Sequence, residues 1–368
     1  MLNRKTEIKK KYLDKIKERT QPRQFYVYIN RKQITAHTYD ELIEKLYNME
    51  YGYTLEGLYP EWLRWKRDNS KTTTKTLREY TYLWNAHLKD DVIIHKHIVS
   101  LHSNDFLELF ERLTCKYDLT KKRFTNIKSL LNGIYRYAIT KKGIISTNPI
   151  REIDCRLFTF KAVNHSDDVF TIEERAQLLK HLANNSDMYA LAICFDFHCT
   201  LRIGELLSLK WSDIEGDNIH VQSQQILDIS MDDELNFSSK TYKDVDHIKG
   251  YADAGFRYIP LTDGAKEILT RAKEVNPTGK YIFMKNDRQL TTDTFNRRLK
   301  AYCREIGIKP CSSHKIRFTV ASILYENGMP LADLQRMLGH TTIAMTLHYL
   351  RKVTPNENAS NLMQNTLG

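Results

Sequence analysis

A run of helical hydrophobic periodicity between residues 54 and 151 constrains the fold more than any other feature of this sequence. Segments striped in this way bury one face and expose the other, so they must pack together to hide their apolar sides. The sequence therefore predicts an all-α domain over residues 54–152, closed by Asn148-Pro149. The four striped segments are 55–68, 74–89, 104–116 and 121–141.

A strand pattern precedes the helical region. Residues 24–29, QFYVYI, have strand composition, and Asn30-Arg31-Lys32 can turn the chain into a second strand. Thr38 and Glu41 then have the spacing of a capping box, which marks the start of a helix. We expect residues 1–50 to form a small sheet with a helix behind it.

The second half of the chain mixes helical and strand periods. Residues 153–168 lack a clear period and are interpreted as a linker, after which Thr171 and Glu174 repeat the capping-box spacing. Helices are expected near 172–183, 188–199, 202–209 and after 291, and strands at 218–226, 257–261 and 281–284. The expected fold is multidomain and mainly α, with a small N-terminal sheet plus helix, an all-α domain, and an α+β domain over 169–368 that ends in a tail.

Charge is the main guide to partners that composition offers. The 368 residues carry a formal net charge of +11, which favours a polyanion as partner. Residues 1–32 hold eleven Lys or Arg against three acids. The predicted central helices are also basic on their polar faces, although a solvated surface explains such charges equally well. Those residues are Arg64, Lys66, Arg67, Lys71, Lys75, Lys121, Lys122, Arg123 and Lys128.

Two further features bear on the compartment. No apolar run approaches the roughly 18 residues that a membrane span needs, and the N-terminus lacks the apolar segment of a secretory signal. The six cysteines show no C-x-x-C pair and no zinc-like spacing, which is typical of reduced thiols. We expect a cytoplasmic protein that is not associated with a membrane, with Cys194 and Cys199 in the core.

The stretch from His314 to Tyr349 gathers residues suited to phosphate chemistry. His314 and Arg317 are three apart in a helical period and should share one face, and Gly328 and Pro330 end that helix. Leu338-Gly339-His340 places a second imidazole at the end of another helix, nine residues before Tyr349. Cationic and imidazole groups without a cluster of acids favour a phosphate-ester substrate and a reaction without a metal.

Arg202 is a candidate from an earlier segment. It lies three residues before Glu205 in CTLRIGELLSLKW, and an ordinary surface ion pair would explain that spacing. An isolated tyrosine such as Tyr349 is equally uninformative in a chain with 21 tyrosines. The order and spacing of several such motifs carry the argument.

Three motifs together resemble the tyrosine recombinases. CTLRIGELLSLKW resembles their first-arginine motif, SHKIRFTVAS their His-x-x-Arg motif, and LGHTTIAMTLHY their Leu-Gly-His motif with the nucleophilic tyrosine nine residues later. The layout resembles the integrases of temperate phages and conjugative transposons. In this resemblance residues 1–50 bind arm-type DNA sites, 54–152 form a SAM-like core-binding domain, and 169–368 form the catalytic domain.

The resemblance implies a role for each site residue. Tyr349 would attack a DNA phosphodiester to give a 3′-phosphotyrosyl link and later a Holliday junction, without metal, ATP or another cofactor. Arg202 and Arg317 would stabilise the charged transition state, and Glu205 would orient Arg202. His314 and His340 would bind the same phosphate, and one of them would take the tyrosine proton.

The family's catalytic lysine is harder to place. It lies on a turn between strands and protonates the leaving 5′-oxygen, and Lys240 in SSKTYKD resembles it best. The connection before RYIPL is longer than the family's usual hairpin, so Lys243 and Lys249 stay as alternatives.

The resemblance also implies partners. These are double-stranded attachment sites of the core type and of the arm type, and a homotetramer assembled on them through the tail from 352 to 368. An excision factor and a host DNA-bending protein are accessory partners that the sequence leaves open. The competing functions are a DNA-binding regulator that has lost catalysis, a metal-dependent nuclease, and a type IB topoisomerase.

Overall fold

The computed structural model describes residues 2–29, 32–162, 169–248 and 256–351. The chain divides into two compact units. The first comprises residues 1–163 together with 229–239, and the second comprises 164–228 and 240–368. No helix of the described residues is both long and apolar enough to cross a membrane. The predicted tail contact, which involves residues 352–368, lies outside the described residues, as does Lys249.

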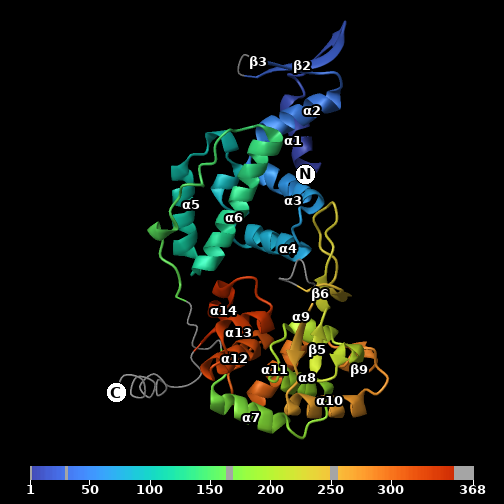
Figure 1. Ribbon diagram of the computed structural model, residues 1–368. Helices are drawn as coiled ribbons and strands as arrows, with labels where there is room; N and C mark the ends of the chain where they lie inside the picture. The colour runs from blue at the N-terminus through green and yellow to red at the C-terminus, as the bar shows by residue number, and fades with distance from the viewer. Residues whose placement is uncertain (1, 30–31, 163–168, 249–255, 352–368) are drawn as a thin grey trace. The chain divides into compact units, whose positions relative to one another are not determined.

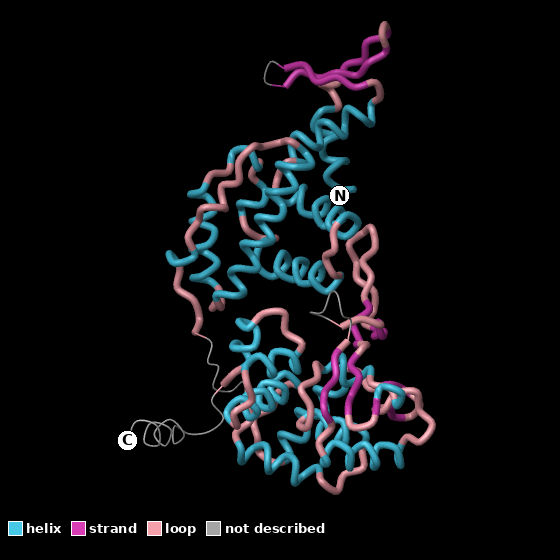
Figure 2. Tube along the Cα trace, in the orientation of Figure 1, coloured by secondary structure: helices cyan, strands magenta, loops and turns pink. Residues whose placement is uncertain are grey.

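The first unit begins with a small sheet and a helix (Figures 1 and 2). Thr38 and Glu41 form both hydrogen bonds of the predicted capping box, and Leu42 of the following helix packs with Ile8 and Val27. The predicted sheet plus helix is confirmed, and one more strand joins it at the edge. The elements are α1 (Leu2–Tyr12), the antiparallel strands β1 (Lys17–Thr20), β2 (Arg23–Ile29) and β3 (Lys32–Ala36), and α2 (Tyr39–Tyr47).

Four amphipathic helices form the rest of the first unit, as predicted. They are α3 (Leu55–Asn69), α4 (Thr74–Leu83), α5 (Ser103–Lys116) and α6 (Lys121–Tyr137). Trp62 of α3 is 2% exposed, and a Cβ at Gly133 of α6 would lie 2.5 Å from its ring. The missing side chain at Gly133 therefore lets the two helices approach closely. Short π-helical turns extend α4 through Trp84–Leu88 and α6 through Ala138–Lys142.

Residues 229–239 pack within the first unit, although they follow a strand of the second unit in the chain. They form a tight hairpin closed by a bridge between Met231 and Phe237. Met231 is buried in the core of the helical region, and Phe237 packs against that core. Arg67 of α3 pairs with Asp233 at 2.8 Å. The long polar connection noted in the sequence thus contains a segment with its own packing.

The second unit is α+β, in agreement with the predicted class (Figures 1 and 2). Its first elements are α7 (Ile172–Leu182), α8 (Met188–Asp196), α9 (Ile203–Ser208), β4 (Ile214–Glu215), β5 (Asn218–Val221), β6 (Gln224–Asp228), β7 (Thr241–Val245) and β8 (Arg257–Pro260). They are followed by α10 (Asp263–Val275), β9 (Met284–Lys285), β10 (Arg288–Gln289), α11 (Thr292–Glu305), α12 (Ser313–Glu326), α13 (Leu331–Leu338) and α14 (Ile343–Tyr349). A three-stranded antiparallel sheet (β4, β5 and β8) and two two-stranded sheets (β6 with β7, and β9 with β10) lie among these helices.

The predicted strand over 281–284 is wrong for most of its length. Only Met284 lies in a strand, and β9 pairs with β10 across a turn whose central residues have φ of 50° and 58°. Ile282 and Phe283 are fully buried without belonging to a ladder. The apolar, strand-like composition of residues 281–284 therefore reflects the burial of this segment and not its membership of a sheet.

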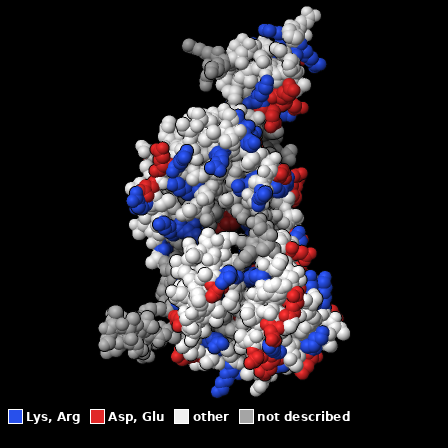
Figure 3. Space-filling view, viewed as in Figure 1, with Lys and Arg blue, Asp and Glu red and all other residues white. Residues whose placement is uncertain are grey.

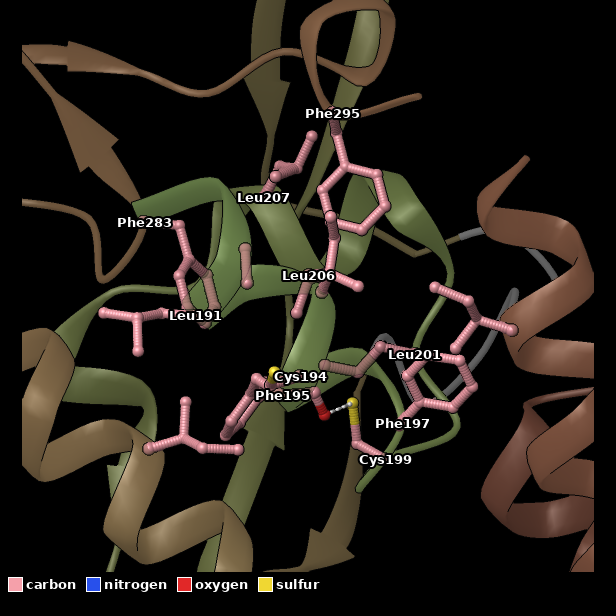
Figure 4. Close-up of a cluster of buried hydrophobic side chains, with 14 of the residues drawn as sticks. Leu191, Cys194, Phe195, Phe197, Cys199, Leu201, Leu206, Leu207, Phe283 and Phe295 are labelled. Atoms are coloured by element: carbon pink, nitrogen blue, oxygen red, sulfur yellow. Dashed lines mark hydrogen bonds between the residues drawn. The ribbon is translucent and has the colours of Figure 1, made fainter. Parts of the chain in front are cut away.

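The core of the second unit fixes the start of α9. Leu201, Leu206 and Leu207 pack with the aromatic side chains of α8 and the segments that follow it (Figure 4). Cys194 and Cys199 are 6% and 2% exposed, which confirms them as core residues. Burying a Leu or Phe side chain contributes roughly 1.5–3 kcal/mol, so this cluster holds the backbone around residue 202 firmly.

Candidate active site

Three short helices position four of the candidate side chains. His314 lies in the first turn of α12 and is exposed, whereas Arg317, one turn later, is 2% exposed. Gly339 ends α13 with a φ of 65°, a left-handed conformation that glycine adopts without strain, and His340 follows it. Tyr349 is the last residue of α14. The predicted helix boundaries around these residues are confirmed.

Arg317 is a buried guanidinium, and one of its three nitrogens has no partner among the described residues. Its Nη1 donates to the carbonyl of Thr200, and its Nη2 donates to the carbonyl of Leu338 and approaches His340 Nε2 at 3.4 Å. Its Nε is buried and has no hydrogen-bond partner among the described residues. Burial lowers the pKa of Arg317 to about 10 against the opposing effect of Glu205, so the group stays charged at neutral pH. A buried donor without an acceptor is costly unless a ligand supplies one.

Glu205 joins Arg202 to a third arginine. Arg202 is the N-cap residue of α9, and its Nη1 lies 2.9 Å from Glu205 Oε1. Arg257 of β8 makes a bidentate pair with the same carboxylate at 3.1 and 2.7 Å. Burial raises the pKa of Glu205, but the arginines, with Arg257 the strongest, outweigh it and lower the pKa to about 2. The carboxylate is therefore ionised in a fully buried position.

The three arginines also converge on one helix end. Successive carbonyl oxygens at the C-terminus of α13 each accept a hydrogen bond from a guanidinium, where the helix dipole favours cations. This arrangement ties the end of α13, and with it His340, to the arginine cluster. The pairs are Met337 with Arg257 Nε (2.8 Å), Leu338 with Arg317 Nη2, and Gly339 with Arg202 Nη2 (2.8 Å).

His340 is neutral in this environment. It is 4% exposed, and burial, followed by the charges of Arg317, Arg202 and Arg257, lowers its pKa to about 4. Because a guanidinium only donates, Nε2 must accept from Arg317, and Nδ1–H then donates to Thr346 Oγ1 at 3.1 Å. Both ring nitrogens are thus engaged.

The depressed pKa predicts acid-sensitive stability. In the unfolded chain His340 has its ordinary pKa of 6.5 and binds a proton below that pH. In the folded protein the same imidazole stays neutral down to about pH 4. Stability present above pH 6.5 is therefore lost as the pH falls through this window, by about 3 kcal/mol from this residue in all and by about 2 kcal/mol down to pH 5. His340→Gln should show a smaller drop in melting temperature between pH 7.5 and 5 than wild type. The exposed His348→Gln serves as control, and an equal drop in all three proteins would contradict the assignment.

Tyr349 packs its ring into the same cluster. The ring centroid lies 4.5 Å from that of His340 and 6.5 Å from that of His314, and the Arg317 guanidinium carbon is 5.4 Å from it. Phe318 covers another side at 4.4 Å. The side chain is half-buried, so the phenol is held near the arginines and is still accessible from solvent.

The site carries an excess of positive charge. Three arginines and one ionised glutamate leave a formal charge of +2, and His340 adds none. Burial also raises the pKa of Asp196 well above its usual range against the effect of Arg317, which favours the neutral carboxyl. A singly charged phosphodiester is opposite in charge to this environment, and guanidinium groups bind such anions through directed hydrogen bonds.

The lysine candidates lie away from these contacts. Lys240, immediately before β7, is 47% exposed and pairs with Asp293 at 3.4 Å. Lys243 pairs with Asp228 across the β6–β7 hairpin at 2.8 Å. Among the described contacts neither ammonium reaches the arginine cluster, so the choice between them stays a prediction.

Sequence reasoning missed Arg257, Thr200 and Thr346. One signal for Arg257 was available: in the strand RYIPL it takes the same face as Ile259, and both are buried. A charged residue on the inward face of a strand needs an internal partner. Thr200 and Thr346 carry no such sign, because their contacts depend on segments distant in the chain.

Several basic side chains of the first unit have internal partners. Arg67 pairs with Asp68 and Asp233, Arg64 donates to the carbonyl of Asp233, and Arg123 pairs with Glu79. Other Lys and Arg side chains are spread over the helical surface (Figure 3). The phosphate contacts expected of this unit stay a prediction.

Comparison with known proteins decides the family. The sequence pattern of the Phage integrase family matches residues 168–355, about half of the chain. The chain belongs to this family. A tyrosine recombinase XerC-like protein of Caldanaerobacter subterraneus subsp. tengcongensis is 24% identical over 265 residues, which cover 65% of this chain and 64% of that protein. The chain thus spans slightly less than two thirds of this relative.

Solved structures of two integrases share the fold. The Tn1549 transposon integrase, solved with transposon right-end DNA, has a TM-score of 0.64 at 20% identity and covers 86% of this chain and 100% of its own. The lambda integrase tetramer bound to a Holliday junction has a TM-score of 0.61 at 17% identity and covers 93% and 96%. The predicted fold class is confirmed.

Proposed function

We propose that this phage integrase family member is a site-specific tyrosine recombinase, the integrase of a mobile element. The observation that carries the proposal is the Tyr349 ring packed against Arg317, whose buried Nε has no acceptor among the described residues. A phosphate oxygen placed there would satisfy that donor and bring phosphorus next to the phenol. A regulator that only binds DNA needs the charge but not this tyrosine.

The proposed chemistry is a transesterification. The Tyr349 oxygen attacks the phosphorus, the bond from phosphorus to the 5′-oxygen breaks, and a 3′-phosphotyrosyl link replaces it. The 5′-hydroxyl of a partner duplex then reverses the step, and two such exchanges pass through a Holliday junction. Arg202 and Arg317 stabilise the charge that accumulates on the non-bridging oxygens.

The two histidines receive different roles. His340 is a weak base with both nitrogens engaged, so it is a poor acceptor for the proton of a phenol whose ordinary pKa is near 10. We assign the proton to exposed His314, and we assign His340 to holding Arg317 and the tyrosine ring. Lys240 is assigned to protonate the leaving 5′-oxygen, with Lys243 and Lys249 as alternatives.

A nicked suicide duplex tests the function. We would place a nick next to the cleavage position in the joined ends of the DNA element that encodes the chain, so that religation fails. In EDTA the protein should form an adduct that survives denaturation. Strict dependence on a divalent metal would favour the nuclease alternative, and relaxation of supercoiled DNA of any sequence would favour a type IB topoisomerase.

The proposed partners follow from the neighbours that share the fold. One of those structures is a tetramer on a Holliday junction, and we propose a homotetramer on two core sites for this chain. Residues 54–152 would bind the core site and residues 1–50 a separate arm site. The tail from 352 to 368 would join neighbouring subunits, and an excision factor and a host DNA-bending protein complete the proposed assembly. A cytoplasmic, nucleoid-associated location follows from this role.

Deleting residues 1–50 tests the arm-site assignment. The three-stranded sheet exposes Arg23 and Tyr28, and the deletion removes most of the basic excess of the N-terminus. Arm-site affinity should fall at least tenfold, and the salt dependence of total DNA binding should flatten. Cleavage of the core suicide duplex should persist. Unchanged affinity for every duplex from the element would refute the assignment.

A further inference from the structure

The Glu205 carboxylate accepts two hydrogen bonds from Arg202 and two from Arg257. Its Oε1 accepts from Arg202 Nη1 at 2.9 Å and from Arg257 Nη1 at 3.1 Å. Its Oε2 accepts from the Arg202 backbone N–H at 2.8 Å and from Arg257 Nη2 at 2.7 Å. Each oxygen thus has one partner from each arginine, and the carboxylate plane is fixed by four hydrogen bonds.

Arg257 itself cannot reach a substrate. Its side chain is 5% exposed, its two terminal nitrogens face Glu205, and its Nε donates to the carbonyl of Met337. Arg202, in contrast, is 18% exposed and uses one terminal nitrogen for Glu205 and the other for Gly339. Any effect of Arg257 on the reaction must therefore pass through the groups that it holds.

We infer that Arg257 is a positioning residue that sets the orientation of the Arg202 guanidinium toward the scissile phosphate. Without its fork, Glu205 would keep only the contacts from Arg202 and could rotate, so Arg202 would lose its fixed anchor. The Nε of the same guanidinium joins β8 to the end of α13, at the Met337 carbonyl, two residues before the carbonyl that Arg202 binds. This inference rests on the proposed role of Arg202 in binding the phosphate.

Arg257→Lys is the informative substitution. It keeps a positive charge beside Glu205, so the buried carboxylate is not left uncompensated. One ammonium cannot bridge both carboxylate oxygens and the Met337 carbonyl in one plane. We expect single-turnover cleavage of the nicked duplex to slow 10–100-fold, with DNA affinity within threefold of wild type and a melting temperature close to it.

A double-mutant cycle separates positioning from general support of the fold. If Arg257 acts through Arg202, Arg257→Lys should cost less than threefold in cleavage rate when Arg202 is already lysine. Arg271→Lys is the matched control, because Arg271 lies in the same unit, is half-buried and donates to the carbonyl of Asn185 at 3.2 Å. It should leave the cleavage rate unchanged in both backgrounds.

The outcomes also separate this inference from the proposed function. The inference would be overturned if the losses of cleavage rate in the two single variants multiplied fully in the double variant. A wild-type cleavage rate for Arg257→Lys, or a loss of DNA affinity as large as the loss of rate, would also overturn it. Each of these results presupposes that the wild-type protein forms the covalent adduct. Absence of any wild-type adduct on the same duplex would instead refute the proposed function.

Discussion

Tyr349→Phe should abolish the covalent protein–DNA adduct while leaving DNA binding intact. The substitution removes one oxygen, the proposed nucleophile, and keeps the ring that packs against His340 and Phe318. No other group can form a phosphotyrosyl link from the same position. On the nicked duplex in EDTA, adduct yield after denaturing electrophoresis should fall at least a thousandfold, to background.

Tyr325→Phe is the matched control for this experiment. Tyr325 lies on α12 of the same unit, is 45% exposed and has no assigned role, so its loss should leave the adduct unchanged. Fluorescence anisotropy with an intact core duplex should give affinities within twofold for both variants and wild type. If the adduct persists in the Tyr349→Phe protein, Tyr349 is not the nucleophile.

Arg317→Lys should reduce the cleavage rate by about 10²–10³. A lysine can keep the charge but not the planar set of donors with which Arg317 binds the Thr200 and Leu338 carbonyls and presents Nε, which has no partner among the described residues. The transition state gains more charge on its equatorial oxygens than the ground state, so the loss should fall on the rate of cleavage more than on DNA affinity.

Folding must be tested beside activity in this variant, because Arg317 is buried. Circular dichroism and the melting temperature report whether the second unit stays intact, and Arg336→Lys, at an exposed position of α13, provides a surface control. A loss of affinity as large as the loss of rate would mean that Arg317 only binds DNA. An unchanged rate in a folded protein would remove Arg317 from the mechanism.

Periodicity and capping signals predicted most of the elements because they act over a few residues. The stripes of α3 to α6 and the capping boxes at Thr38 and Thr171 are local, and the structure forms them where they were expected. The segment 281–284 was misjudged because burial and sheet pairing favour the same residue types. Within the site, His314 and Arg317 share a helix face by spacing alone.

Spacing could not reveal which groups would share a partner. The spacing of Arg202 and Glu205 predicts no more than an ordinary ion pair. In the structure Glu205 is fully buried and is also bound by Arg257, 52 residues later in the chain. The neutral state of His340 also depends on tertiary burial and on three arginines from three segments. Neither the shared carboxylate of Glu205 nor the neutral state of His340 can be predicted from neighbouring residues, because both arise from electrostatic interactions between distant parts of the chain.

The sequence by itself determined the helices, the order of the motifs and the residues able to do phosphate chemistry. These depend on local periodicity and on side-chain type, which the chain carries whether or not it is folded. Only the tertiary structure decided that three arginines meet at the end of α13 and that Tyr349 packs beside one of them, Arg317, whose Nε has no partner within the described part of the chain. The physical reason is desolvation: burial gives each of these charges its protonation state and its orientation, and burial is a property of the assembled fold.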